Sequence, residues 1–132
     1  MSNESQQDVW AYRGRRVLVT GATGFIGRWV ARELSAVGAE LFLAARDADS
    51  FRAVSAAYHI RGTLCLADLA RPGAFSALYA QARPVVTFNL AGYGVDPGER
   101  DAELAAALNT RLVTEIAQTI AADAPADWDG LR

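Results

Sequence analysis

The chain has 132 residues, of which 52% are hydrophobic and 21% are charged. This length and composition suit one folded globular domain and leave no room for a second. Thirteen basic residues against fifteen acidic ones give a formal charge of -2, which excludes the strongly basic surface that binds nucleic acid. All of the basic residues counted there are arginines, so the sequence contains no lysine.

Cysteine content and apolar runs limit the remaining classes. Cys65 is the only cysteine, so the chain can form no internal disulfide and has no thiol cluster for a metal. We expect a buried, inert thiol there and no metal ligands. Residues 1–7 are polar, and no apolar run approaches the roughly 20 residues needed to span a bilayer. We therefore expect a cytoplasmic protein with no membrane partner.

From residue 15 onward, short runs rich in valine and leucine alternate with longer segments of helical periodicity. This pattern predicts an α/β fold with a doubly wound parallel sheet and crossover helices. Strands are expected at residues 17–20, 40–44, 63–66 and 85–90. Helices are expected at residues 25–37, 50–57, 72–82 and 101–122. The first helix should end at a left-handed Gly38, and Pro72 should open the third.

The domain limits follow from these elements. Residues 1–14 are expected to be a tail, residues 15–122 the folded domain, and residues 123–132 a loop. The strand order expected for this topology is 3-2-1-4, which leaves the fourth strand on an edge although it is apolar on both faces. A further segment, a partner chain or a second copy should cover that edge.

Three glycines lie where the first strand meets the first helix, in the motif TGATGFIG at residues 20–27. We expect Gly21 to permit the turn out of the strand, Gly24 to let the backbone approach a diphosphate, and Gly27 to let the helix pack against the sheet. The free N–H groups at the helix start would then face the phosphates. A purely structural turn is the alternative, but such a turn needs only one glycine.

This motif resembles the fingerprint of the extended short-chain dehydrogenases/reductases, the NAD(P)-dependent epimerase, dehydratase and reductase group. The resemblance extends over about residues 15–122 and implies a Rossmann-type sheet that binds NAD or NADP. Within the motif, the cofactor-binding residues that it implies are Gly21, Thr23, Gly24, Phe25, Ile26 and Gly27.

The end of the second strand is expected to select the cofactor. Arg46 stands where reductases of this family carry an arginine for the 2′-phosphate of NADP, and Arg28 could assist it. NADP is therefore favoured over NAD. The adjacent Asp47 keeps NAD open, because a carboxylate can instead bond both ribose hydroxyls.

By the same resemblance, cofactor contacts are expected in three further places. A pair after the third strand would bind the adenine, small residues after the fourth strand would lie against the ribose and nicotinamide, and an asparagine of the last helix would contact the cofactor or the active-site strand. These residues are Asp68, Leu69, Leu90, Ala91, Gly92 and Asn109. A turn or helix cap is the alternative for Asp68, and an exposed position for Asn109.

No complete catalytic set of the family can be assembled from this sequence. The family transfers hydride with a Ser or Thr and a Tyr-x-x-x-Lys pair, in which the lysine lowers the pKa of the tyrosine. No tyrosine of this chain is followed by a lysine, so no catalytic residue is assigned, and whether the chain is itself an enzyme stays open. We expect structural roles for Tyr93 and His59.

The resemblance implies the NAD(P)-binding portion of an epimerase, dehydratase or reductase that acts on a nucleotide sugar or a small carbonyl compound. A C-terminal part beyond residue 132 would supply the substrate site, so truncation is the simplest explanation. The alternative is a non-catalytic NADP-binding sensor or partner subunit. S-adenosylmethionine binding is less favoured, because its proteins usually have an acidic residue at the position of Arg46.

Overall fold

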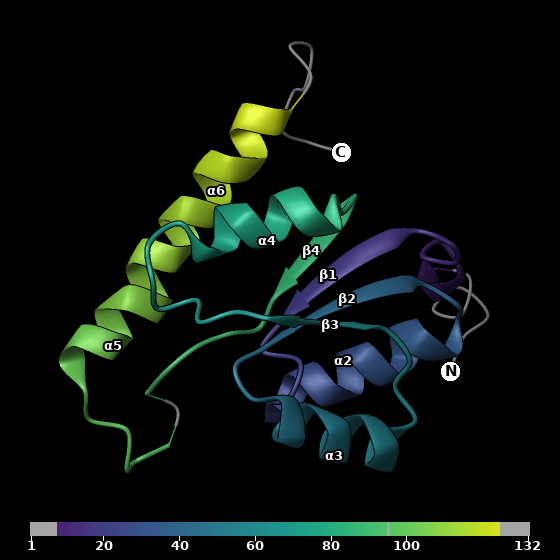
Figure 1. The fold of residues 1–132 in the computed structure, drawn as a ribbon, viewed down its shortest axis with the longest axis horizontal. Helices are drawn as coiled ribbons and strands as arrows, with labels where there is room; N and C mark the ends of the chain where they lie inside the picture. The colour runs from purple at the N-terminus through teal and green to yellow at the C-terminus, as the bar shows by residue number, and fades with distance from the viewer. Residues whose placement is uncertain (1–7, 95, 125–132) are drawn as a thin grey trace.

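The computed structural model describes residues 8–94 and 96–124 (Figure 1). Its strands are β1 (Arg16–Thr20), β2 (Glu40–Ala45), β3 (Thr63–Leu66) and β4 (Val86–Asn89). Its helices are α2 (Phe25–Ala36), α3 (Ala48–Tyr58), α4 (Ala74–Ala82), α5 (Ala102–Ala106), the π-helical η1 (Ala107–Arg111) and α6 (Leu112–Asp123). In the described part of the chain, no helix is both long enough and apolar enough to cross a bilayer.

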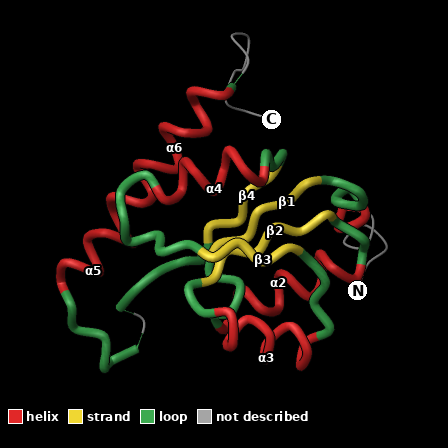
Figure 2. Tube along the Cα trace, in the orientation of Figure 1, coloured by secondary structure: helices red, strands yellow, loops and turns green. Residues whose placement is uncertain are grey.

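The four strands form one parallel sheet in the order β3-β2-β1-β4, as predicted. Helices α2 and α3 cover one face, and α4 and α6 cover the other (Figures 1 and 2). Alternate residues of β1 therefore enter different cores. Leu18 packs with Phe75 of α4 and Leu112 of α6, whereas Val17 packs with Leu34 of α2. Burial on both faces explains the nearly continuous apolar runs of the strands.

Strand β4 lies at the edge of the described sheet, where it pairs with β1 through Val17↔Val86 and Thr20↔Asn89. Its residues are only half-buried, and the preceding Val85 is 60% exposed. The predicted apolar edge is therefore present in the described part of the chain.

The last helix differs from the single regular helix predicted for residues 101–122. Asp101 caps its start by accepting a hydrogen bond from the Leu104 N–H at 3.0 Å. The chain then widens into the π-helical η1 before α6 begins. Within η1 the side chain of Asn109 bonds both backbone groups of Tyr93. Single π-helical turns within an α-helix are frequent at functional sites.

Two details of the helix ends were also predicted from single residues. Gly38 has a φ of +84° and ends the α2 segment, as expected. Pro72 lies outside α4, which begins at Ala74 after the left-handed Gly73. The prediction that Pro72 opens this helix was wrong because the chain makes a further turn, closed by the bond from the Ala74 N–H to the Arg71 carbonyl, before the helix starts.

Candidate cofactor-binding site

A cleft of about 220 Å³ opens at the carboxyl ends of the strands. The connection through α2 leaves β1 on one face of the sheet and the connection through α4 reaches β4 on the other, so this is the switch point at which such sheets bind ligands. Of the residues predicted to bind the cofactor, the cleft is lined by Gly21, Thr23, Gly24, Arg46, Asp68, Leu69, Leu90, Ala91 and Gly92. Phe25, Ile26, Gly27 and Asn109 do not line it.

The three glycines of the loop have different physical roles. Gly21 has a φ of +66°, and a Cβ there would lie 2.5 Å from the Leu90 carbonyl oxygen. A Cβ on the buried Gly27 would lie 1.9 Å from the Gly21 carbonyl oxygen. At Gly24 the nearest atom to a Cβ would be the Gly21 oxygen at 3.2 Å. The fold therefore requires Gly21 and Gly27, whereas Gly24 borders the open cleft.

The start of α2 presents unused backbone donors beside this loop. The Gly24 N–H bonds the Gly21 carbonyl, and the Arg28 N–H bonds the Gly24 carbonyl. Among the described residues, the N–H groups of Phe25, Ile26 and Gly27 have no hydrogen-bond acceptor. Such N–H groups at a helix N-terminus attract an anion. Phe25 and Ile26 are 80% and 62% exposed, and their N–H groups belong to the first turn of α2, directly after the glycine loop.

Thr20 joins the two strands that flank the cleft. It is fully buried, and its hydroxyl donates to Asn89 Oδ1 at 2.6 Å. The hydroxyl oxygen of Thr20 also accepts hydrogen bonds from the N–H groups of Leu90 at 3.1 Å and Ala91 at 3.3 Å. Sequence reasoning missed this role, although a threonine and an asparagine ending two adjacent predicted strands were a usable signal.

Thr20→Val is expected to lower the free energy of unfolding by about 2 kcal/mol, because valine keeps the shape but removes the partner of the Ala91 N–H and of Asn89. Urea denaturation followed by circular dichroism measures the change. Thr20→Ser is the matched control and should lose only about 1 kcal/mol, since it keeps the hydroxyl and removes one buried methyl group. Equal stability of the valine variant and wild type would contradict this role for Thr20.

Arg46 and Asp47 are separated by the structure although they are adjacent in sequence. Arg46 is exposed and lines the cleft. Asp47 is the N-cap of α3, where its carboxylate accepts from the Asp49 N–H at 2.8 Å and the Ser50 hydroxyl at 3.0 Å. The hydrogen bond from the Asp49 N–H lowers the pKa of Asp47 most, and the bond from the Ser50 hydroxyl lowers it further. Asp47 does not line the cleft.

The side chains of Asp68 and Asn109 both form hydrogen bonds with backbone groups. Asp68 lines the cleft, and its carboxylate also accepts from the Ala70 N–H at 3.1 Å, which is a turn contact. Asn109 accepts from the Tyr93 N–H at 3.0 Å and donates to the Tyr93 carbonyl at 2.7 Å. It therefore holds the loop that follows Gly92, and its predicted contact with the cofactor or the active-site strand stays a prediction.

The other residues singled out from the sequence, Tyr93, His59 and Cys65, lie outside the lining of the cleft. The Tyr93 hydroxyl accepts from the Asp101 N–H at 3.1 Å. His59 is exposed and ends α3 in a left-handed conformation with φ +54°. Cys65 is buried, and this burial raises the pKa of its thiol. The burial expected for Cys65 is confirmed, and the structural roles expected for Tyr93 and His59 stay predictions.

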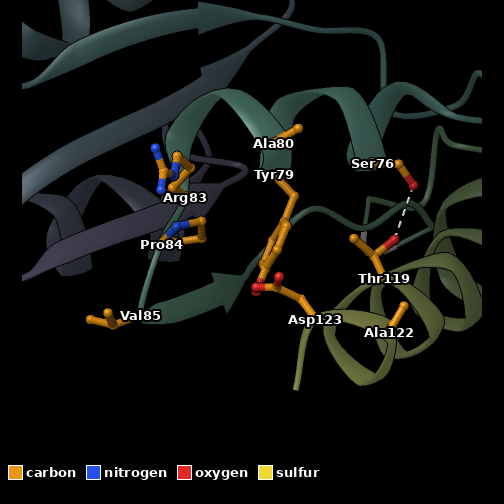
Figure 3. A pocket seen from close by; sticks show the side chains of 9 residues that line it. All are labelled: Ser76, Tyr79, Ala80, Arg83, Pro84, Val85, Thr119, Ala122 and Asp123. Atoms are coloured by element: carbon orange, nitrogen blue, oxygen red, sulfur yellow. Dashed lines mark hydrogen bonds between the residues drawn. The ribbon is translucent and has the colours of Figure 1, made fainter. Parts of the chain in front are cut away.

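A larger cavity of about 650 Å³ lies at the opposite end of β4, between α4 and α6 (Figure 3). There the Tyr79 hydroxyl donates to Asp123 at 3.1 Å. Burial is the main cause that raises the pKa of Tyr79, and the Asp123 carboxylate raises it further. Ser76 and Thr119 face each other with hydroxyl oxygens 3.0 Å apart. This cavity includes no glycine loop, and ligands of parallel sheets bind at the carboxyl ends of the strands. The smaller cleft is therefore the better candidate.

Comparison with known proteins agrees with the geometry of the cleft. Residues 17–126 match the model of the NAD dependent epimerase/dehydratase family. The chain belongs to this family. The sequence prediction of an extended short-chain dehydrogenase/reductase is thereby confirmed.

Individual relatives of this epimerase/dehydratase chain support the same conclusion. It is 35% identical over 103 residues to the Streptomyces violaceoruber protein named "Granaticin polyketide synthase putative ketoacyl reductase 1", covering 74% of this chain and 38% of that protein. A metagenomic short-chain oxidoreductase solved with NADP is 26% identical, with a TM-score of 0.68, covering 85% of this chain and 57% of the other. A short-chain dehydrogenase from Burkholderia cenocepacia J2315, also solved with NADP, is 25% identical with a TM-score of 0.65, covering 84% and 51%.

These matches fix the part of the family fold that the chain represents. It spans 38% of the length of the curated relative and about half of the two solved structures. The chain comprises the NAD(P)-binding portion of a short-chain dehydrogenase/reductase of the epimerase/dehydratase family, and its cofactor is a nicotinamide dinucleotide.

Proposed function

We propose that the cleft binds NADP in preference to NAD. The observation that carries this preference is the contrast between two neighbouring residues: Arg46 lines the cleft, whereas the carboxylate of Asp47 caps α3. A guanidinium suits the 2′-phosphate that distinguishes NADP, and NAD would require an acidic residue at the ribose hydroxyls. Both solved relatives named above contain NADP, which supports the same choice.

The cleft and the start of α2 beside it together fit the parts of this dinucleotide. The unused N–H groups of Phe25, Ile26 and Gly27 and the open side of Gly24 suit a diphosphate. Asp68 and Leu69 would hold the adenine end, as the family resemblance implies. The segment Leu90–Gly92 would lie along the ribose and nicotinamide, where the small residues Ala91 and Gly92 let the backbone pass close to the ligand. When bound, the cofactor would supply the hydride chemistry, since its reduced form, NADPH, donates a hydride and its oxidised form accepts one, and the residues of this chain would bind and orient it.

We propose that the whole protein reduces or rearranges a small carbonyl compound or a nucleotide sugar. The similarity to a protein named ketoacyl reductase favours carbonyl reduction among these reactions. The sequence contains no Tyr-x-x-x-Lys pair, so a further segment would supply the acid-base residues. The open edge of β4 is the place where such a segment, a partner chain or a second copy of this chain would pair.

Equilibrium titration of the purified protein with NADP and with NAD tests the cofactor proposal. NADP should bind at least about tenfold more tightly, since charge-assisted hydrogen bonds to one phosphate contribute about 1.5–3 kcal/mol. Equal affinity for the two dinucleotides would contradict the role of Arg46. Tighter binding of NAD would reverse the proposed preference.

A second candidate function is a non-catalytic NADP-binding sensor or subunit, favoured by the complete absence of lysine from the sequence. Native mass spectrometry of the protein isolated from its source separates the two candidates. A polypeptide much longer than 132 residues with bound NADP supports the enzyme. A natural polypeptide of 132 residues with bound NADP supports the sensor or subunit.

A further inference from the structure

Arg28 of α2 is held against the glycine loop from two sides. Its Nε donates to the Gly24 carbonyl at 3.0 Å, and its Nη2 donates to the Thr23 carbonyl at 2.8 Å. Its guanidinium carbon lies 5.3 Å from the ring centroid of Tyr58, the last residue of α3. That ring in turn meets the ring of Trp29 edge-on at 5.1 Å. The guanidinium is therefore fixed between the loop backbone and an aromatic pair.

These two hydrogen bonds determine where the loop directs its N–H groups. A peptide group is planar, so its carbonyl and its N–H point in opposite directions. The bond to the Gly24 carbonyl therefore fixes the N–H of Phe25, one of the donors left unused at the start of α2. The bond to the Thr23 carbonyl fixes the Gly24 N–H, which closes the turn onto Gly21.

The same contacts affect the electrostatics of the loop. Carbonyl oxygens carry partial negative charge and would repel a diphosphate, whereas a guanidinium bonded to them offsets that charge. Arg28 itself does not line the cleft, in contrast to Arg46. Its position therefore does not support the expectation from the sequence that Arg28 assists Arg46 at a 2′-phosphate.

We propose that Arg28 is a positioning residue for the diphosphate site, which consists of the glycine loop and the free N–H groups at the start of α2. The ring of Tyr58 holds the Arg28 guanidinium in the position that makes these bonds. Arg28 orients the loop donors and does not contact the 2′-phosphate. This inference rests on the proposed binding of NADP in the cleft.

The test compares two ligands with the same adenosine 2′-phosphate end. NADP contains the diphosphate and 2′-AMP does not. Arg28→Leu should weaken NADP binding about tenfold, the effect expected for losing charge-assisted hydrogen bonds, and change 2′-AMP binding less than about twofold. Binding is measured by calorimetry for NADP and by NMR titration for 2′-AMP. An equal loss for both ligands, or no loss for NADP, would overturn the proposal.

Arg32→Leu is the matched control, because Arg32 lies one turn further along α2 with its guanidinium 5.3 Å from the Trp29 ring and bonds no loop carbonyl. It should bind both ligands as wild type does. Arg28→Lys keeps the charge but not the forked geometry, so it should still lose at least about fivefold for NADP. Full affinity in the lysine variant would show that charge alone matters and would overturn the positioning role.

Tyr58 gives a test that leaves Arg28 in place. Tyr58→Leu should weaken NADP binding about threefold by freeing the guanidinium, whereas Tyr58→Phe keeps the ring and should match wild type. If Arg28→Leu does not fold, this pair decides the question, and equal NADP affinity in the two Tyr58 variants overturns the proposal. Wild-type protein that binds neither ligand would overturn the proposed function and this inference with it, whereas normal wild-type binding with unaffected variants would overturn the inference alone.

Discussion

Arg46→Ala is expected to weaken NADP binding by about 30-fold and to leave NAD binding within about twofold. Charge-assisted hydrogen bonds contribute about 1.5–3 kcal/mol, and each 1.4 kcal/mol corresponds to a tenfold change in affinity. The effect should be confined to NADP because only its 2′-phosphate would meet the guanidinium. Fluorescence or calorimetric titration with both dinucleotides measures the change. Arg46→Lys should recover part of the lost affinity, since lysine keeps the charge without the fork.

Arg61→Ala is the control for this prediction. Arg61 is also an exposed arginine, but it does not line the cleft. Its loss should leave both affinities unchanged, apart from a small effect of the net charge that added salt would suppress. If Arg46→Ala weakened NADP and NAD equally, Arg46 would act on a part common to both dinucleotides, which would contradict its assignment to the 2′-phosphate.

Gly27→Ala is expected to lower the free energy of unfolding by about 3 kcal/mol, at the upper end of the usual cost of overpacking. The added Cβ would lie 1.9 Å from the Gly21 carbonyl oxygen and 2.7 Å from its carbon. Both are backbone atoms, so α2 would have to move away from β1. Chemical denaturation measures the loss. NADP binding should fall as well, because the same movement displaces the glycine loop.

Gly24→Ala is the contrasting variant in the same loop. Gly24 has φ −70°, which any residue can adopt, and its added Cβ would have only the Gly21 oxygen nearby, at 3.2 Å. Stability should therefore change by less than about 1 kcal/mol, while NADP binding should be lost because the methyl group occupies space at the cleft. A stable Gly27→Ala variant, or one no less stable than Gly24→Ala, would contradict the assignment of these roles.

Much of the fold could be predicted because the signals are local. Buried parallel strands produce apolar runs, and these placed β1 to β4 to within one residue at each end. The start of α3 was predicted at residue 50 but lies at Ala48, since Asp47 caps the helix through the Asp49 N–H. The π-helical η1 could not be predicted, because its contact from Asn109 to Tyr93 depends on how a distant loop folds back.

The site divides in the same way between local and distant contacts. Gly21 and Arg46 were found because a short motif and the end of a strand define their positions, and both line the cleft. Thr20 was missed because its partners lie about 70 residues away in sequence. The contacts of Arg28 could not be predicted for a related reason. Its contact with Tyr58 brings together α2 and α3, and the sequence pattern alone shows only a charged residue directly after the glycine motif.

Titration of ¹⁵N-labelled protein with NADP, followed by backbone NMR, is the most direct test of where the cofactor binds. The amide signals of Gly21, Phe25, Arg46 and Gly92 should shift and saturate together. The signals of Ser76 and Thr119, which line the other cavity, should stay in place. Shifts confined to the cavity between α4 and α6, or no saturable shifts at the glycine loop, would contradict NADP binding at the carboxyl ends of the strands.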